Sequence, residues 1–211
     1  MTPAPTAPAL SRADCTYTSC YCEENVHRLI DTLLQRGLAA DAGALFAVFI
    51  SNPSRTVPLW AQRKGLNPEG LVIWDYHVIL IQEVAGSGDW LVWDLDTSLD
   101  FPVPFADYAG QAFKTMDWAL GTQFDRFFRV IPAAAYLDNF ASDRSHMVAE
   151  DGSWKAPPPE YPCLVAKNGD TMTLSKYLDM SIVDSQDERW GSVMDEETFL
   201  EPHLPIRNTD C

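Results

Sequence analysis

Apolar residues recur at helical spacing directly after a cluster of cysteines. They lie at i, i+3, i+4, i+7 and i+8 and are Val26, Leu29, Ile30, Leu33 and Leu34. Thr18 and Ser19 precede this run as polar residues that suit a helix cap, and Gly37 follows it as a stop signal. The pattern predicts an amphipathic helix over residues 19–36.

Continuous apolar runs predict the strands. Residues 45–51 form such a run and predict a buried strand, whereas residues 57–60 contain a proline and suit an edge strand. Residues 71–84 and 89–96 predict two strands of a hairpin, because a glycine-containing turn joins them. The remaining pattern predicts a strand at 127–131, a proline-broken loop at 101–105, and helices at 105–114, 133–139, 173–180 and 196–200.

The register of this hairpin brings three ionisable side chains together. If residues 86–87 form a two-residue loop, His77 faces Asp96, and Asp94 lies diagonally opposite His77. Facing residues share one side of a sheet, so all three point the same way from an otherwise apolar face. Such groups are costly to bury unless they satisfy one another. The register alone does not choose between Asp94 and Asp96 as the partner of His77.

Composition and charge limit the class of protein. The chain has 211 residues and a net charge of −15, which argues against nucleic acid as a partner and disfavours an anionic membrane surface. We expect a disordered, Pro/Ala-rich lead at residues 1–13 and a single catalytic domain at 14–211, with no secretory signal and no membrane span. The five cysteines are odd in number and three are crowded, so we expect no disulfide framework and a reducing, intracellular compartment.

A thiol at a helix start, a histidine and an aspartate form the candidate chemistry. The helix dipole favours the thiolate of a cysteine in the first turn, and the thiolate is the nucleophilic form. The histidine would take the thiol proton, and the carboxylate would hold its tautomer and orientation. The order Cys, His, Asp with a helix-borne nucleophile is typical of papain-like and transglutaminase-like enzymes.

Six segments of the chain carry a family resemblance. They are YTSCYCEENV at 17–26, AVFISN at 47–52, VIWDYHV at 72–78, DLDT at 94–97, FASDRSHM at 140–147 and PPPEYPC at 157–163. Together they look like the protein N-terminal glutamine amidohydrolases, over about residues 14–163, and Trp190-Gly191 extends the match.

The resemblance implies a papain-like α/β (α+β) fold with a central, mainly antiparallel sheet flanked by helices, acting as a monomer. It implies hydrolysis of the side-chain amide of an N-terminal glutamine to glutamate and ammonia, without a metal or other cofactor. In eukaryotes the new glutamate feeds the N-degron pathway, which implies cytoplasmic and nuclear placement and contact with the downstream enzymes of that pathway.

The matching motifs assign roles to three residues. The resemblance implies that Cys22 is the nucleophile, His77 the base and Asp94 the third member. Cys22 would attack the glutamine carbonyl and form a thioester, which water then hydrolyses.

Substrate binding requires acceptors for a free α-ammonium beside the nucleophile. The candidates are Ser19, Tyr21, Glu24, Asp75 and Asp96, with Glu23 and Asp143 as further acids. Acids in the first turn of a helix are stabilising regardless of substrate, so Glu23 and Glu24 also have a structural interpretation. We interpret Asp143 and Arg144 as an internal ion pair that fixes its loop, and the remaining histidines, His27, His146 and His203, as non-catalytic.

Two alternatives remain open at this point. The same chemistry could serve a papain-like peptidase or a transglutaminase. A zinc-stabilised binding module could instead use Cys15, Cys20, Cys22 and a histidine, although the spacing lacks the usual Cys-x2-4-Cys pairs.

Overall fold

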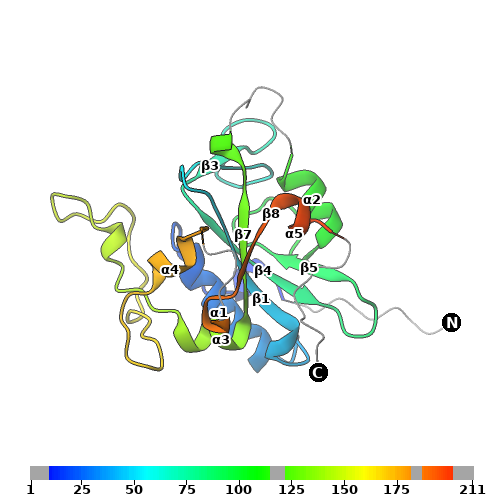
Figure 1. Ribbon diagram of the computed structural model, residues 1–211, viewed down its shortest axis with the longest axis horizontal. Helices are drawn as coiled ribbons and strands as arrows, with labels where there is room; N and C mark the ends of the chain where they lie inside the picture. Colours follow the sequence, from blue (N-terminus) through cyan, green and yellow to red (C-terminus); the bar gives the residue numbers. More distant parts are fainter. Residues whose placement is uncertain (1–9, 115–121, 182–186, 202–211) are drawn as a thin grey trace.

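A six-stranded antiparallel sheet forms the centre of the computed structural model, which describes residues 10–114, 122–181 and 187–201 (Figure 1). The strand order is β6-β5-β4-β1-β7-β8. The bounds are Leu45–Ser51 for β1, His77–Glu83 for β4, Trp90–Trp93 for β5, Val103–Pro104 for β6, Phe127–Pro132 for β7 and Ser192–Asp195 for β8. A separate two-stranded sheet pairs β2, Val57–Leu59, with β3, Val72–Trp74.

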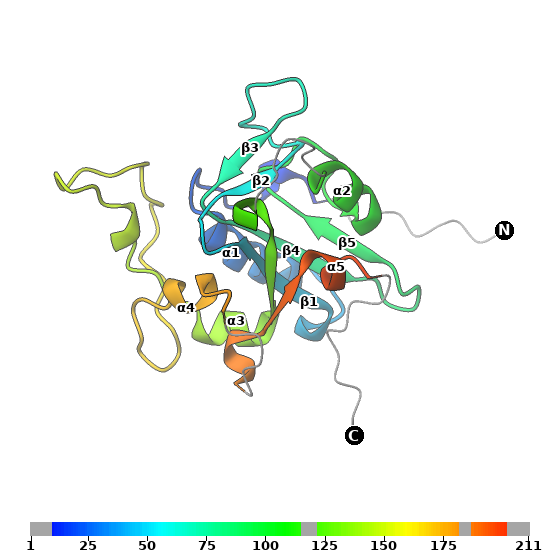
Figure 2. The same cartoon turned by 45° about the horizontal axis from the view of Figure 1, so that its top comes forward.

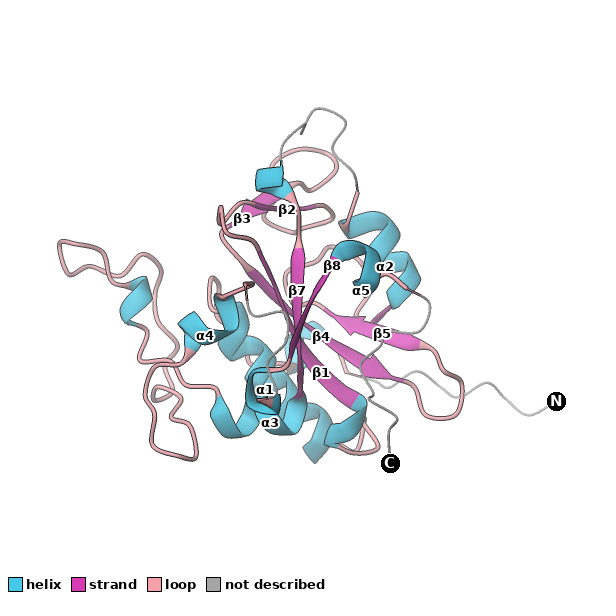
Figure 3. Cartoon of the chain, in the orientation of Figure 1, coloured by secondary structure: helices cyan, strands magenta, loops and turns pink. Residues whose placement is uncertain are grey.

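Helices cover both faces of the central sheet (Figures 1 and 2). They are α1, Cys22–Gln35; α2, Phe105–Ala112; α3, Ala133–Asn139; α4, Leu174–Leu178; and α5, Glu196–Phe199. One apolar core lies between the sheet and α1, α3 and α4, and a second lies between the sheet and α2 and α5. The predicted antiparallel sheet with flanking helices is therefore confirmed (Figure 3). Within the described residues, none of the helices has the length and apolar character needed to cross a membrane.

The first helix begins three residues later than predicted. Its first residue is Cys22, and the preceding Tyr21 makes no side-chain capping bond. The predicted caps Thr18 and Ser19 lie outside the helix, so this part of the prediction is wrong. The side chain of Asn25 instead binds the backbone of Thr18, donating to its carbonyl and accepting from its amide, both at 2.8 Å. This clamp leaves Cys22 at the first turn.

The predicted stop of α1 is confirmed. Gly37 has a φ of 65°, the left-handed conformation that glycine adopts without strain. The amide of Leu38 donates to the carbonyl of Leu33 at 2.9 Å, which closes the helix end in a Schellman-type turn.

The hairpin has the predicted register but a shorter ladder. Leu80 pairs with Trp93 and Glu83 with Trp90, which is the predicted register. The amide of Val84 donates to the carbonyl of Asp89 at 2.8 Å, so the loop between them comprises residues 85–88. The ladder stops at Trp93, because the amide of Asp96 donates to the carboxylate of Asp94 at 2.9 Å instead of continuing the sheet. The predicted strand 71–84 also divides, since β3 leaves to pair with β2.

The other differences from the prediction concern short segments. The strand β8 was not predicted, and β6 forms where we expected only a loop; there its proline sits on an edge strand, which tolerates the missing N–H. Of the expected lead at 1–13, residues 1–9 lie outside the described part. Leu10 is buried in the core and Arg12–Asp14 form a 3-10 turn, so the ordered chain begins before residue 14.

Candidate active site

Cys22 and His77 meet where two elements begin. Cys22 is the first residue of α1 and His77 the first residue of β4. Packing of α1 against β4 brings these two starts together. The backbone of Val78, the residue after His77, reaches the Cys22 sulfur and acts to lower the pKa of its thiol, against larger influences that raise it. The thiol therefore lies beside the strand that carries the histidine.

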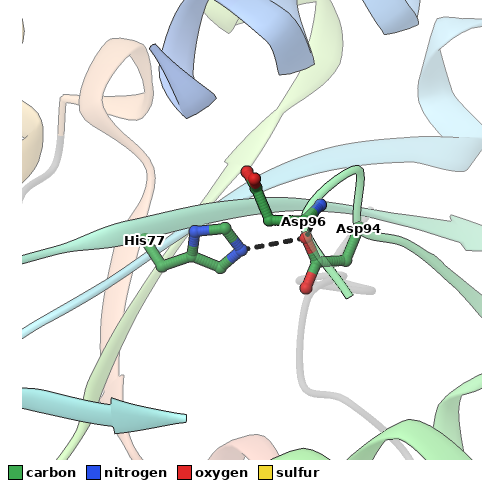
Figure 4. Close-up of side chains that lie close together, drawn as sticks. All are labelled: His77, Asp94 and Asp96. Carbon is green, nitrogen blue, oxygen red and sulfur yellow. Dashed lines mark hydrogen bonds and ion pairs between the residues drawn. The ribbon is translucent and has the colours of Figure 1, made fainter. Parts of the chain in front are cut away.

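The imidazole of His77 pairs with Asp94 rather than with Asp96. Its Nε2 lies 2.9 Å from Oδ1 of Asp94, and both side chains are buried (Figure 4). The ring stacks on the indole of Trp74, with centroids 5.1 Å apart and planes at 17°. Among the described residues, Nδ1 has no hydrogen-bond partner. A proton on Nε2, held by the carboxylate, leaves Nδ1 as the basic nitrogen.

The carboxylate of Asp94 accepts four hydrogen bonds. Its Oδ1 accepts from the imidazole of His77 and from the backbone amide of Asp96. Its Oδ2 accepts from the hydroxyl of Tyr108 at 2.8 Å and from the side-chain amide of Gln62 at 3.3 Å. These bonds occupy all the acceptor sites of a carboxylate. Burial alone would raise the pKa of Asp94, but His77 and these donors bring it below its ordinary value. Asp94 is therefore ionised and fixed in orientation.

Tyr108 and Gln62 were missed from the sequence. Tyr108 lies on α2, and Gln62 lies in the segment between β2 and β3. The available signal was indirect: an aspartate on an apolar face needs several donors, and a tyrosine on an adjacent amphipathic helix can supply one.

Charges around the site set the protonation of its two central groups. Burial would lower the pKa of His77, but Asp94 and then Asp96 raise it above its usual value. Burial raises the pKa of the Cys22 thiol well above its usual value, and the carboxylates of Glu23 and Asp96 add to this. These influences oppose the stabilisation of the thiolate that we expected from the helix start, so a base beside Cys22 becomes important for attack by this thiol.

Glu24 is engaged inside the protein. Its carboxylate is fully buried and binds Arg144 through two hydrogen bonds of 2.8 Å, from Nε and from Nη2. The predicted Asp143–Arg144 pair is wrong, since Asp143 accepts from the amide of Ser145 instead. Asp143 is adjacent to Arg144 in the chain and cannot easily form the two-bond pairing with the guanidinium that the buried carboxylate of Glu24 forms. Arg144 thus occupies both oxygens of Glu24, which favours the structural interpretation of Glu24 over a role in substrate binding.

Glu23 lies against Cys22. Its Oε2 accepts from the hydroxyl of Tyr76 at 3.1 Å and lies 3.6 Å from Sγ of Cys22. Its Oε1 lies 3.5 Å from Nε2 of His146, so a histidine that we had set aside forms part of the site. His203 lies outside the described residues.

A cavity of about 420 Å³ opens over Cys22. Two of the predicted substrate-binding residues, Asp75 and Asp96, line it, together with Cys20, Arg55, Trp74, Tyr76, His146, Met147, Lys155, Leu174 and Leu178. Ser19 and Tyr21 do not line it. The hydroxyl of Tyr21 donates to the carbonyl of Ala156, and Ser19 is exposed beside Cys20.

Cys20 lines the same cavity as Cys22 but differs from it in exposure and backbone conformation. It is exposed, has a φ of 70°, and accepts a hydrogen bond on Sγ from Lys64 at 3.1 Å. It lies before the helix rather than in its first turn. The geometry beside His77 therefore belongs to Cys22.

One group of side chains has the spacing of metal ligands among the described residues, and it contains no cysteine. It comprises His77, Asp94 and Asp96, with ligand atoms within 4.8 Å of one another. The acceptor sites of Asp94 are already occupied by protein donors, so a cation there would have to displace them. The zinc module built on Cys15, Cys20 and Cys22 does not assemble in this part of the chain.

Known proteins are similar in sequence to most of this chain. A family model described as N-terminal glutamine amidase matches residues 17–203. A protein N-terminal glutamine amidohydrolase from Oryza sativa subsp. indica is 46% identical over 82% of this chain and 75% of the relative. Proteins of the same name from Drosophila grimshawi and Arabidopsis thaliana are 47% and 45% identical over 80% of this chain, covering 80% and 77% of their own lengths.

Proposed function

The chain belongs to the N-terminal glutamine amidase family, and from that premise we propose how it hydrolyses the side-chain amide of an N-terminal glutamine. The proposed nucleophile is Cys22, the base His77 and the orienting carboxylate Asp94. The observation that carries this assignment is the buried His77–Asp94 pair of 2.9 Å at the start of the strand beside the Cys22 thiol.

The first half of the reaction forms a thioester. Nδ1 of His77 takes the thiol proton as Sγ of Cys22 bonds to the amide carbon, which becomes a tetrahedral oxyanion. The imidazolium then returns that proton to the amide nitrogen, the carbon–nitrogen bond breaks, and ammonia leaves. Asp94 stabilises the imidazolium throughout, because it remains ionised against Nε2.

The second half releases glutamate. His77 takes a proton from water as the water oxygen attacks the thioester carbonyl, and the carbon–sulfur bond breaks. The proton returns to the departing sulfur of Cys22, so the site regains its thiol. The backbone N–H of Cys22, at the positive end of α1, is our candidate for stabilising both oxyanions.

We further infer the setting in which this reaction occurs. The protein would act as a monomer in the cytoplasm and nucleus, and the new N-terminal glutamate would pass to the next enzymes of the N-degron pathway. Family membership supports these statements.

A peptide panel tests the proposed function. Peptides with N-terminal Gln, N-terminal Asn, internal Gln and acetylated N-terminal Gln are incubated with the enzyme, and released ammonia is measured. We expect release from the first peptide alone. Cleavage of a peptide bond would indicate a peptidase, amide formation with an added primary amine would indicate a transglutaminase, and either result would overturn the proposal.

A further inference from the structure

Asp96 stands apart from the other buried carboxylates. The described residues contain four buried acids, Glu23, Glu24, Asp94 and Asp96. Three lie within 4 Å of a cationic group or histidine: Glu24 binds Arg144, Asp94 binds His77, and Glu23 approaches His146. Asp96 is 4% exposed and has no such partner in the described part of the chain. A buried charge of this kind is costly unless a ligand compensates it.

The Asp96 carboxylate is held in place and borders the reaction cavity. Its Oδ1 accepts a hydrogen bond of 2.5 Å from the hydroxyl of Tyr17, and its backbone amide is fixed by Asp94. It lines the same cavity as Cys22. Since Tyr17 supplies a neutral donor only, the negative charge remains available to a cation that enters the cavity.

Asp96 lies close enough to His77 for one glutamine side chain to reach both residues. In an extended glutamine, roughly 5 Å separate the α-nitrogen from the amide carbon, since four bonds of about 1.5 Å join them. The carboxylate oxygen of Asp96 lies within 4.8 Å of the ligand atoms of His77 and Asp94. An amide carbon placed between Cys22 and His77 therefore leaves the α-nitrogen within reach of Asp96.

We propose that Asp96, positioned by Tyr17, binds the α-ammonium of the substrate and thereby restricts the reaction to glutamine at a free N-terminus. The proposal rests on the proposed deamidation of N-terminal glutamine and adds the residue that recognises that terminus. An internal or acetylated glutamine presents a neutral amide N–H there, which cannot compensate a buried carboxylate.

Binding of a cation at Asp96 would also act on the nucleophile. Asp96 is one of the carboxylates that raise the pKa of Cys22. An ammonium held on Asp96 offsets that negative charge, so the substrate itself favours the thiolate that attacks it.

The test compares two peptides that differ only in the α-amino group. One begins with glutamine, and the other begins with a 4-carbamoylbutanoyl group, the desamino analogue of glutamine. Asp96→Asn removes the charge but keeps the size and the acceptor for Tyr17. Asp75→Asn tests the rival acceptor, because it removes the same charge from an exposed residue that lines the same cavity.

We expect the native enzyme to prefer the glutaminyl peptide by about 100-fold in kcat/KM, the discrimination typical of a charged hydrogen bond. Asp96→Asn should bring this ratio close to one, and Asp75→Asn should preserve it. Tyr17→Phe should raise KM for the glutaminyl peptide more than for its desamino analogue, which tests the positioning role independently should Asp96→Asn misfold.

Three results decide the matter. If Asp96→Asn and Tyr17→Phe each lowered kcat/KM equally for both peptides, Asp96 would act only through His77 and Asp94. That result would overturn the proposal. Loss of the ratio in Asp75→Asn instead would assign the α-ammonium to Asp75. Absence of ammonia from the glutaminyl peptide with the native enzyme would refute the proposed function itself, a result that the variants cannot mimic.

Discussion

Replacing Arg144 with methionine tests the structural role of Glu24. The Arg144 side chain donates to both oxygens of Glu24 and to the carbonyls of Pro159, Tyr161 and Pro162. It thus joins the loop before α4 to the first turn of α1. Methionine fills a similar volume but leaves the Glu24 carboxylate buried without a partner.

The expected loss of stability follows from that geometry. Removing one member of a buried ion pair costs about 3–5 kcal/mol, because the remaining charge stays desolvated. For a chain of this size, a loss of about 4 kcal/mol lowers Tm by roughly 8–16 °C. Lys167→Met is the control: its pair with Asp138 is exposed and should change the free energy of unfolding by less than about 1 kcal/mol.

The free energy of unfolding of both variants is measured by urea denaturation monitored by circular dichroism. A third variant, Glu24→Gln, adds a functional test. We expect Glu24→Gln to lose stability while its KM for an N-terminal glutamine peptide stays within about threefold of the native value. The reasoning is refuted if Arg144→Met costs less than about 1 kcal/mol. It is equally refuted if Glu24→Gln is fully stable but raises KM tenfold or more.

Three further predictions concern the reacting groups. Cys22→Ala and His77→Ala should abolish ammonia release, with the fold retained as judged by circular dichroism. Cys20→Ala should keep much of the activity. If Cys20→Ala were inactive and Cys22→Ala active, the nucleophile would be Cys20. Asp94→Asn should lower kcat by about 10³–10⁴-fold. It should also move the acidic limb of the pH profile to lower pH, because Asp94 raises the pKa of His77; an unshifted limb would contradict this pairing. Glu23→Gln should speed alkylation of Cys22 by iodoacetamide at pH 8, mapped by mass spectrometry, because Glu23 raises the pKa of that thiol; an unchanged rate would count against this influence.

Features set by local periodicity could be predicted from the sequence. The apolar spacing placed α1 and its end at Gly37, and the turn residues placed the β4–β5 register correctly. That register was enough to bring His77, Asp94 and Asp96 to one place. These features depend on neighbours within a few residues or across one tight turn, where spacing decides the geometry.

Partners that come from distant segments could not be predicted in this way. Glu24 and Arg144 are 120 positions apart, and adjacency in sequence favoured Asp143 as the partner of Arg144 instead. Tyr108 reaches Asp94 only because α2 packs over the sheet. Whether Asp94 or Asp96 pairs with His77 depended on where the β4–β5 pairing ends. It ends where the backbone amide of Asp96 binds the Asp94 carboxylate, a contact that exists only in the folded site.

The four donors around Asp94 have a consequence for the order of folding. They come from positions 2, 14, 17 and 32 residues away along the chain, so short loops bring them together. Small loops cost little closure entropy and form early, whereas contacts across 120 residues, such as Arg144 with Glu24, form late. We therefore expect the histidine and its carboxylate to be in place before α1 is locked against the sheet. The newly made chain would then complete its reactive pair only in the final stage of folding.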